Sequence, residues 1–254
     1  ADMKTILVYS PEEAARNSFV VKKFREQLGA ELVDLTARVR ADVVINRSND
    51  FGVANYYSKM GAKVFNGAEF CRIANDKEMS YRFMEMRGIE IMPIGYSVPP
   101  FVKKPKSSHG GNGVVMCHSA EEYDENQVCQ MPASDLGRDV RVWVLGGEIV
   151  ASILRVSDTD FRSNYCLGGR AELYDLSAEE MAEVQKIIDL VSPLGAHYYG
   201  IDFVFNHGKA VFNELEDTVG ARMVYDLTDI DIIDRYIEYI KNNIFLYLYK
   251  NLSF

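Results

Sequence analysis

The sequence predicts a mixed fold, in which an α/β segment is followed by an antiparallel-rich α+β segment. Residues 1–66 alternate strand-like and helix-like stretches, and this alternation is typical of a parallel sheet with helices on its faces. After Gly88 the chain is punctuated by proline and glycine, and its later apolar stretches are paired around hairpin turns. The 254 residues correspond to one large or two modest domains, which need no disulfides to fold.

The first 66 residues contain two predicted helices and four predicted strands. Residues 18–28 carry apolar side chains at helical spacing, and Gly29 stops this helix. A second helix is expected over residues 53–60. The strands are compact apolar stretches, expected at residues 4–9, 31–35, 42–45 and 63–65.

The rest of the chain is expected to combine three helices with short strands and hairpins. A helix over residues 76–87 begins at Asn75 or Asp76 as its N-cap. Ser177 and Glu180 form a capping-box pattern at the start of a helix over residues 177–194. The other expected elements are short strands at 101–104, 114–117 and 128–131, a small helix near 120–123, hairpins that join 139–145 to 148–155 and 199–205 to 210–215, and a last helix over about 231–246.

Composition excludes several classes of protein. With 48% hydrophobic and 26% charged residues, the chain is globular and not disordered. Its 28 basic and 37 acidic residues give a formal charge of −9, which argues against a nucleic-acid partner. The four cysteines form no CxxC pair, so no zinc site or disulfide framework is indicated. The longest apolar run, residues 244–249, is too short to span a membrane, and the first residues resemble no signal peptide. A cytoplasmic, reduced protein is expected.

A glycine-rich segment between two predicted strands is the first candidate for binding chemistry. Residues 105–113 read Pro-Lys-Ser-Ser-His-Gly-Gly-Asn-Gly, and Lys104 precedes them. Backbone N–H groups of such loops approach phosphate oxygens closely, and Lys104 adds a positive charge. The segment matches neither a Walker A motif nor GxGxxG. A flexible hairpin loop without a ligand is the alternative interpretation.

Three acidic residues on neighbouring predicted strands are the second candidate. Glu214 and Glu216 are two residues apart in one strand, so their side chains share a face. Asp202 lies in an otherwise apolar strand that pairs with it. Carboxylate oxygens without histidine or cysteine suit Mg²⁺. Solvent-facing acids on an ordinary strand are the alternative.

A group of arginines is the third candidate. Arg138 and Arg141 lie at the start of one predicted strand, Arg155 ends its partner, and Arg162 precedes Gly168-Gly169. Guanidinium groups bind phosphate or carboxylate in a bidentate manner. Scattered surface ion pairs are the alternative.

The order of these features resembles that of the ATP-grasp enzymes, and within them the RimK-like carboxylate–amine ligases. The resemblance covers about residues 60–225. It implies an ATP-grasp fold with a short Rossmann-like pre-ATP-grasp domain at residues 1–66. The ATP-grasp domain would occupy residues 67–254, with a lid lobe at about 93–133 and a C-terminal lobe at about 134–254. The matching segments are Asn75-Asp76-Lys77, residues 101–113, 137–147, 160–169 and 200–220.

The resemblance also implies a role for individual residues. Lys77 and Lys104 would contact the phosphates of ATP, and Gly110, Gly111 and Gly113 would cover them. One or two Mg²⁺ ions, with Mn²⁺ as an alternative, would be held by Asp202, Glu214 and Glu216, although the family usually reads Glu-x-Asn where this chain reads Glu214-Leu215-Glu216. The remaining nucleotide contacts would be Gln130 and Met131 with the adenine, Asp139 with the ribose, and Arg162, Ser163 and Asn164 along the nucleotide.

The function implied is an ATP-dependent ligase that joins a carboxylate to an amine or a thiol. ATP would convert the carboxylate, of a small molecule or a peptide, to an acyl phosphate, with release of ADP and phosphate. The catalytic residues would be Arg155, Arg162, Asn164 and Arg222, with Arg155 or Arg222 stabilising the oxyanion. No obvious base emerges: His109 is a candidate, and a solvated loop histidine is the alternative.

Two other functions stay open, a nucleotide-binding module without ligase activity and a small-molecule kinase. The apolar residues 244–249 are expected to pack on the core or on a second subunit, so a homodimer is a further expectation.

Overall fold

The computed structural model describes residues 2–163 and 168–251, and the strands of its first sheet lie between Thr5 and Phe65. Four parallel strands lie in the order β2-β1-β3-β4. Helix α2 ends at Gly29, whose φ of 62° is in the left-handed region that glycine adopts without strain. The strands are β1 (Thr5–Val8), β2 (Glu31–Val33), β3 (Val43–Asn46) and β4 (Lys63–Phe65), and the helices are α1 (Pro11–Arg16), α2 (Ser18–Leu28) and α3 (Phe51–Lys59).

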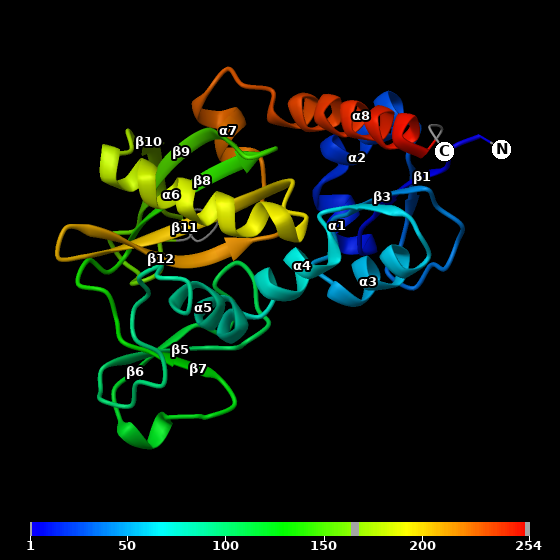
Figure 1. Cartoon of the computed structure of the whole chain (residues 1–254). Helices are drawn as coiled ribbons and strands as arrows, with labels where there is room; N and C mark the ends of the chain where they lie inside the picture. The colour runs from blue at the N-terminus through cyan, green and yellow to red at the C-terminus, as the bar shows by residue number, and fades with distance from the viewer. Residues whose placement is uncertain (1, 164–167, 252–254) are drawn as a thin grey trace.

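A five-stranded antiparallel sheet forms the centre of the molecule (Figure 1). Its strand order is β10-β9-β8-β11-β12. Turns at Gly146-Gly147 and at residues 207–208 join β8 to β9 and β11 to β12, so both predicted hairpins are confirmed. The strands are β8 (Arg138–Leu145), β9 (Glu148–Val156), β10 (Arg170–Leu173), β11 (Tyr198–Asn206) and β12 (Lys209–Glu216).

Alternating side chains of this sheet enter two different cores. Val140 and Val142 of β8 pack in a cluster with residues of α4 (Ala68–Ala74), α5 (Lys77–Glu85) and α6 (Ala178–Val191). Trp143, on the opposite face, packs in a cluster with residues of α2, α7 (Arg222–Leu227) and α8 (Ile232–Asn251). The sheet is therefore covered on both faces. A short 3₁₀ helix, η3 (Ser192–Leu194), follows α6.

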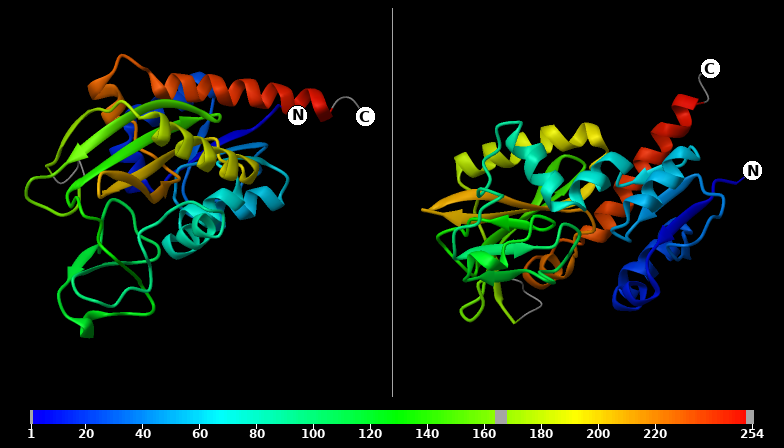
Figure 2. Two further views of the ribbon diagram at one scale, coloured as in Figure 1. Left: turned by 60° about the vertical axis from the view of Figure 1, so that its left-hand side comes forward. Right: turned by 90° about the horizontal axis from the view of Figure 1, so that it is seen from below.

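A third, smaller sheet stands apart from the other two, at the bottom of Figure 1 (see also Figure 2). It has three antiparallel strands in the order β6-β5-β7. Phe101, Cys117 and Cys129 form its small core. The elements are β5 (Phe101–Lys104), β6 (Val115–Cys117), β7 (Val128–Gln130) and the 3₁₀ helix η1 (Ala120–Glu122). All lie within the predicted lid lobe, whose bounds, like those of the other domains, stay a prediction.

Helix α8 packs along α2, as the views of Figures 1 and 2 agree. Lys23 of α2 binds Asp231 at 2.9 Å and Asp234 at 2.6 Å. Ile244 of α8 is buried in the core, whereas Phe245 and Leu246 are exposed. The side chains of residues 247–249 lie outside those described, so the predicted homodimer stays a prediction. No helix in the described ranges is both long and apolar enough to cross a membrane.

Candidate active site

A cavity lies between the small β6-β5-β7 sheet and the central sheet. Its lining is of two kinds. Apolar side chains such as Val102, Met131 and Val204 form one part, and acidic and basic side chains form the other. The charged lining residues are Lys77, Lys104, Asp135, Arg138, Asp139, Arg141, Arg155, Arg162, Asp202, Glu214 and Glu216. Most residues that the sequence assigned to the nucleotide and the metal thus come together here.

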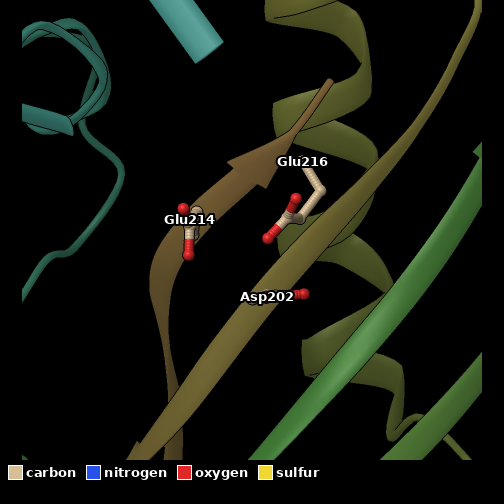
Figure 3. A group of neighbouring side chains, drawn as sticks. All are labelled: Asp202, Glu214 and Glu216. Carbon is tan, nitrogen blue, oxygen red and sulfur yellow. The ribbon is translucent and has the colours of Figure 1, made fainter. Parts of the chain in front are cut away.

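The three predicted metal ligands converge. Asp202 of β11 is paired in register with Glu214 of β12, and Glu216 follows on the same face (Figure 3). One carboxylate oxygen from each lies within 4.8 Å of the other two. A set of oxygen donors alone, without histidine or cysteine, fits Mg²⁺. The expectation that these acids share a face is confirmed, and their binding of a metal stays a prediction.

Two arginines, the partly buried Arg141 and the buried Arg155, neutralise Asp202. Arg141 binds its carboxylate in a bidentate manner at 2.8 and 2.7 Å and also contacts Glu216 at 3.0 Å. Arg155 binds Asp139 at 2.7 and 2.6 Å and reaches Asp202 at 3.0 Å. Burial alone would raise the pKa of Asp202, but these guanidinium groups hold it below its usual value.

Glu216 differs from Asp202 in its charge environment. It is buried beside Glu214 and Asp202, and Arg141 is the cation that contacts it. Burial, assisted by the two neighbouring carboxylates, raises the pKa of Glu216 to about 7. Ionising this additional acid therefore costs free energy, and a bound divalent cation would offset that cost.

The two predicted phosphate-binding lysines are both buried but have different partners. Lys77, the first residue of α5, binds the Glu214 carboxylate and donates to the Ser108 carbonyl at 2.7 Å. Lys104 donates to the Tyr81 hydroxyl at 2.8 Å, and also to Gln130 Oε1 at 2.7 Å and Asn213 Oδ1 at 3.0 Å. Burial of the Lys104 ammonium group lowers its pKa to about 8.

The predicted adenine-binding residues sit where β7 ends. The Gln130 side chain accepts from Lys104 and donates to the Met92 carbonyl at 2.9 Å, so both ends of its amide are used within the protein. The Met131 N–H donates to the Pro93 carbonyl at 2.9 Å, while its side chain lines the cavity. Adenine contact by these two residues stays a prediction, and it would come through the Met131 side chain or the backbone that follows.

The glycine-rich loop reaches the cavity through some of its glycines. Gly110 and Gly111 are among the lining residues. Gly113 is not among them; a Cβ added there would lie 2.8 Å from Pro105 Cγ, so this glycine packs against the start of its own loop. All three have φ between 66° and 73°, which explains the need for glycine.

Of the remaining predicted residues, some line the cavity and others do not. Arg162 and the buried Ser163 line the cavity, and Arg162 donates to the Gly111 carbonyl at 3.3 Å. Asn164 lies outside the described residues. Arg222 is exposed at the start of α7 and is not among the described lining residues.

Arg141 is one of the arginines that the sequence indicates as phosphate- or carboxylate-binding groups, and its position two residues after Asp139 in a strand places both side chains on one face. Two further residues received no role from the sequence. Tyr81 and Asn213 bind Lys104, but one is a helix residue 23 positions earlier and the other is 109 positions later. No local pattern could reveal those two contacts.

Comparison with known proteins gives the family. The model of the RimK-like ATP-grasp domain matches residues 68–240. An uncharacterized protein of Mycoplasma pneumoniae, the MG011 homolog, is 26% identical over 86% of this chain and 85% of its own length. A probable alpha-L-glutamate ligase of Maridesulfovibrio salexigens is 33% identical over 75% of this chain and 71% of its own.

Solved structures share the fold. The D-cycloserine synthetase DcsG superposes with a TM-score of 0.73 at 14% identity, over 94% of this chain and 99% of its own. The ATP-grasp ligase PsnB, complexed with a phosphomimetic variant of its minimal precursor, Mg and ADP, gives 0.65 at 16% identity, over 95% and 98%. The predicted ATP-grasp fold is thereby confirmed. The chain belongs to the RimK-like ATP-grasp family and is an ATP-grasp ligase of the class that forms carbon–nitrogen bonds.

Proposed function

We propose that the protein uses ATP to activate a carboxylate as an acyl phosphate and then joins it to an amine. The single observation that supports this best is the convergence of Asp202, Glu214 and Glu216 on one cavity with Lys77 and Lys104. The cations would attract a triphosphate, and the acids would hold its metal ion.

The nucleotide would lie along the cavity with its base at the apolar lining and its phosphates at the charged lining. Lys77 and Lys104 would contact the phosphates, and Gly110 and Gly111 would approach them through backbone N–H groups. Asp139 would contact the ribose, although Arg155 already binds its carboxylate. Arg162 and Ser163 line the same cavity and would follow the nucleotide.

Mg²⁺ would be held by Asp202, Glu214 and Glu216, and when bound it would offset the negative charge of the phosphates. Arg141 keeps the Asp202 carboxylate ionised and oriented toward this position. Lys77 holds the Glu214 side chain in place, since it contacts that carboxylate directly.

Two steps would make up the reaction. A carboxylate oxygen of the substrate attacks the γ-phosphorus, the bond to the β–γ bridging oxygen breaks, and ADP leaves. The amine nitrogen then attacks the carbonyl carbon, the carbon–oxygen bond to phosphate breaks, and phosphate leaves with the electron pair. Arg155, which already lines the cavity, would stabilise the oxyanion, and Arg162 would lie beside the reacting phosphate. The catalytic role of Asn164, which is outside the described residues, stays a prediction from the resemblance. Arg222 would have to approach the cavity from its exposed position.

L-glutamate is the amine that we propose first. The relative from Maridesulfovibrio salexigens is named a probable alpha-L-glutamate ligase, and this chain covers 71% of its length. The acid would be a small molecule or a peptide that ends in a carboxylate.

Release of ADP tests the proposal. The enzyme is given Mg-ATP, a panel of amino acids and short peptides as acids, and either L-glutamate or hydroxylamine as the nucleophile. We expect ADP release that depends on both an acid and a nucleophile, and a hydroxamate when hydroxylamine is used. ATP binding without turnover across the panel would favour a binding module, and a stable phosphorylated product without loss of amine would favour a kinase.

The metal assignment has its own test. Glu214→Gln keeps the size of the side chain but removes a charged ligand, so we expect ADP release to fall by about 100-fold or more, in line with the loss of one electrostatic catalytic group. Glu172→Gln, an exposed acid on β10 of the same sheet, is the matched control and should keep full activity. Full turnover in Glu214→Gln would contradict the assignment.

A further inference from the structure

The glycine-rich loop carries a histidine that the proposed reaction does not use. His109 is half-buried and directly precedes Gly110 and Gly111, which line the cavity, although His109 is not itself among the described lining residues. The chain has four histidines. His118 and His207 are exposed. His197 lies 2.6 Å from the Tyr239 hydroxyl, and neither of these two residues lines the cavity. His109 is thus the histidine that lies next to the site.

Hydrogen bonds on both sides of His109 hold the backbone of the loop that carries it. The Lys77 ammonium donates to the carbonyl of Ser108 at 2.7 Å, and the Lys77 N–H donates to the carbonyl of Lys106 at 2.8 Å. After the histidine, the Gly111 carbonyl accepts from Arg162 at 3.3 Å. The loop is therefore bound to α5 on one side and to the segment after β9 on the other. Both contacts are made by cations proposed to bind phosphate.

Three charged side chains influence His109, and two of them, Lys77 and Glu214, line the cavity. The three are Lys77 on α5, Glu214 on β12 and Asp217 directly after β12. Burial lowers the pKa of the imidazole and Lys77 lowers it further, whereas the two carboxylates oppose this effect. A histidine with a lowered pKa is neutral at pH 7 and can accept a proton. The hinge that follows β7, where the adenine would bind, contributes no charge to this set.

We propose that His109 is the general base of the second step, which accepts a proton from the attacking amine. This inference rests on the proposed function. The amine of an amino acid is protonated at neutral pH, and its nitrogen has no free electron pair until that proton leaves. One proton of the ammonium group passes to the imidazole, the nitrogen–carbon bond forms, and the bond from carbon to the phosphate oxygen breaks as phosphate leaves with the electron pair. The second proton that the nitrogen loses as the amide forms leaves with the phosphate. The imidazolium then returns its proton to water.

The loss of activity on replacing His109 depends on whether the residue is a general base or a phosphate-binding group. Hydroxylamine is largely unprotonated at neutral pH, so it attacks an acyl phosphate without a base. If His109 is the base, His109→Gln makes hydroxamate normally but joins L-glutamate slowly. If His109 binds phosphate instead, both reactions slow together, because both need the acyl phosphate.

The test compares these two nucleophiles at pH 7, with an acid that supports hydroxamate formation by the wild-type enzyme. We expect His109→Gln to lose about 10²- to 10³-fold in amide formation, as for removal of a general base, and little in hydroxamate formation. Amide formation by the variant should rise steeply with pH as free amine accumulates. His118→Gln, an exposed histidine of the lid, is the matched control, and unchanged ATP binding of each variant shows that the site is intact.

The outcomes separate the two proposals. A variant that keeps amide formation, or one that loses both products equally, overturns the base role and leaves the ligase proposal in place. A wild-type enzyme that forms no hydroxamate with any acid contradicts the ligase proposal, and the base role fails with it.

Discussion

Lys104 shows how a single residue of the site depends on its surroundings. Its ammonium group has three N–H donors, and Tyr81, Gln130 and Asn213 each accept one. None of these three partners is a carboxylate, so burial is not compensated by a direct ion pair, and the pKa falls to about 8. Near neutral pH the residue is therefore charged but close to losing its proton.

This pKa gives a prediction about the binding of ATP. A protonated Lys104 attracts the phosphates and a neutral one does not, so affinity for ATP should weaken as the pH rises through about 8, and binding above that pH should take up a proton. Lys104→Met should weaken binding at pH 7 by about 10- to 100-fold, since a charge-assisted hydrogen bond contributes about 1.5–3 kcal/mol. Calorimetric titration between pH 7 and 9 measures both effects. Equal pH dependence in wild type and variant would contradict the role of Lys104.

At the scale of elements, a contact between two glycines sets the entry to α4. The Gly67 N–H donates to the Gly195 carbonyl at 2.8 Å, where η3 leads toward β11. A Cβ added at Gly195 would lie 2.8 Å from the Gly67 Cα, so the two backbones come together because neither residue has a side chain. This contact helps to place α4 and, after it, the helix that begins with Lys77.

Gly195→Ala should therefore destabilise the protein more than a strained turn alone would. Its φ of 87° costs about 1–2 kcal/mol for alanine, and the steric overlap adds about 1–3 kcal/mol. Gly208→Ala is the matched control, because its φ of 77° is similar and nothing lies within 4 Å of the added Cβ. Urea denaturation gives both free energies of unfolding. If the two variants lose the same stability, the glycine contact has no energetic importance.

The hairpins and the capped helices were predictable because local chemistry determines them. Asp76, one of the two predicted candidates with Asn75, caps α5, and Ser177 caps α6 with the predicted capping box. Among the elements in the described parts of the chain, four were not predicted: α1, α4, β10 and α7. Helices α4 and α7 have no side-chain cap, and β10 is an edge strand with mostly exposed side chains, so none of these three has a clear local signal.

At the scale of the whole molecule, one side chain joins the first sheet to the ATP-grasp core. Asn66, which follows β4, accepts from the N–H groups of His197 and Tyr198 at 2.8 and 2.9 Å. It donates to the Tyr198 carbonyl at 2.8 Å and to the Asp217 carboxylate at 2.9 Å. Asn75 binds the other oxygen of Asp217 at 2.9 Å. Asp217 directly follows Glu216, so this network connects the first sheet to the acidic cluster.

Asn66→Ala should lower the free energy of unfolding by about 3 kcal/mol or more. The change leaves the buried N–H of Tyr198, the partly buried N–H of His197 and one oxygen of the buried Asp217 carboxylate without this partner, and each unsatisfied group costs about 1–3 kcal/mol. Asn126→Ala, an exposed asparagine of the lid that bonds only to Asp124 among the contacts described, should change stability little. Thermal and urea denaturation of both variants provide the comparison. A loss below 1 kcal/mol in Asn66→Ala would show that the two parts are joined mainly by apolar packing.

The sequence alone determined the fold class, the family and the principal charged residues of the site. Strand alternation, caps, glycine turns and the order of motifs are local properties, because each depends on residues a few positions apart. The tertiary structure decided which charges meet. Arg141 binds Asp202, and Lys104 binds Asn213, across long separations in the chain. His109 lies between two carbonyls, those of Ser108 and Gly111, which accept from the side chains of Lys77 and Arg162. The pKa values of these side chains follow from burial and from partners on other elements, which no stretch of sequence specifies.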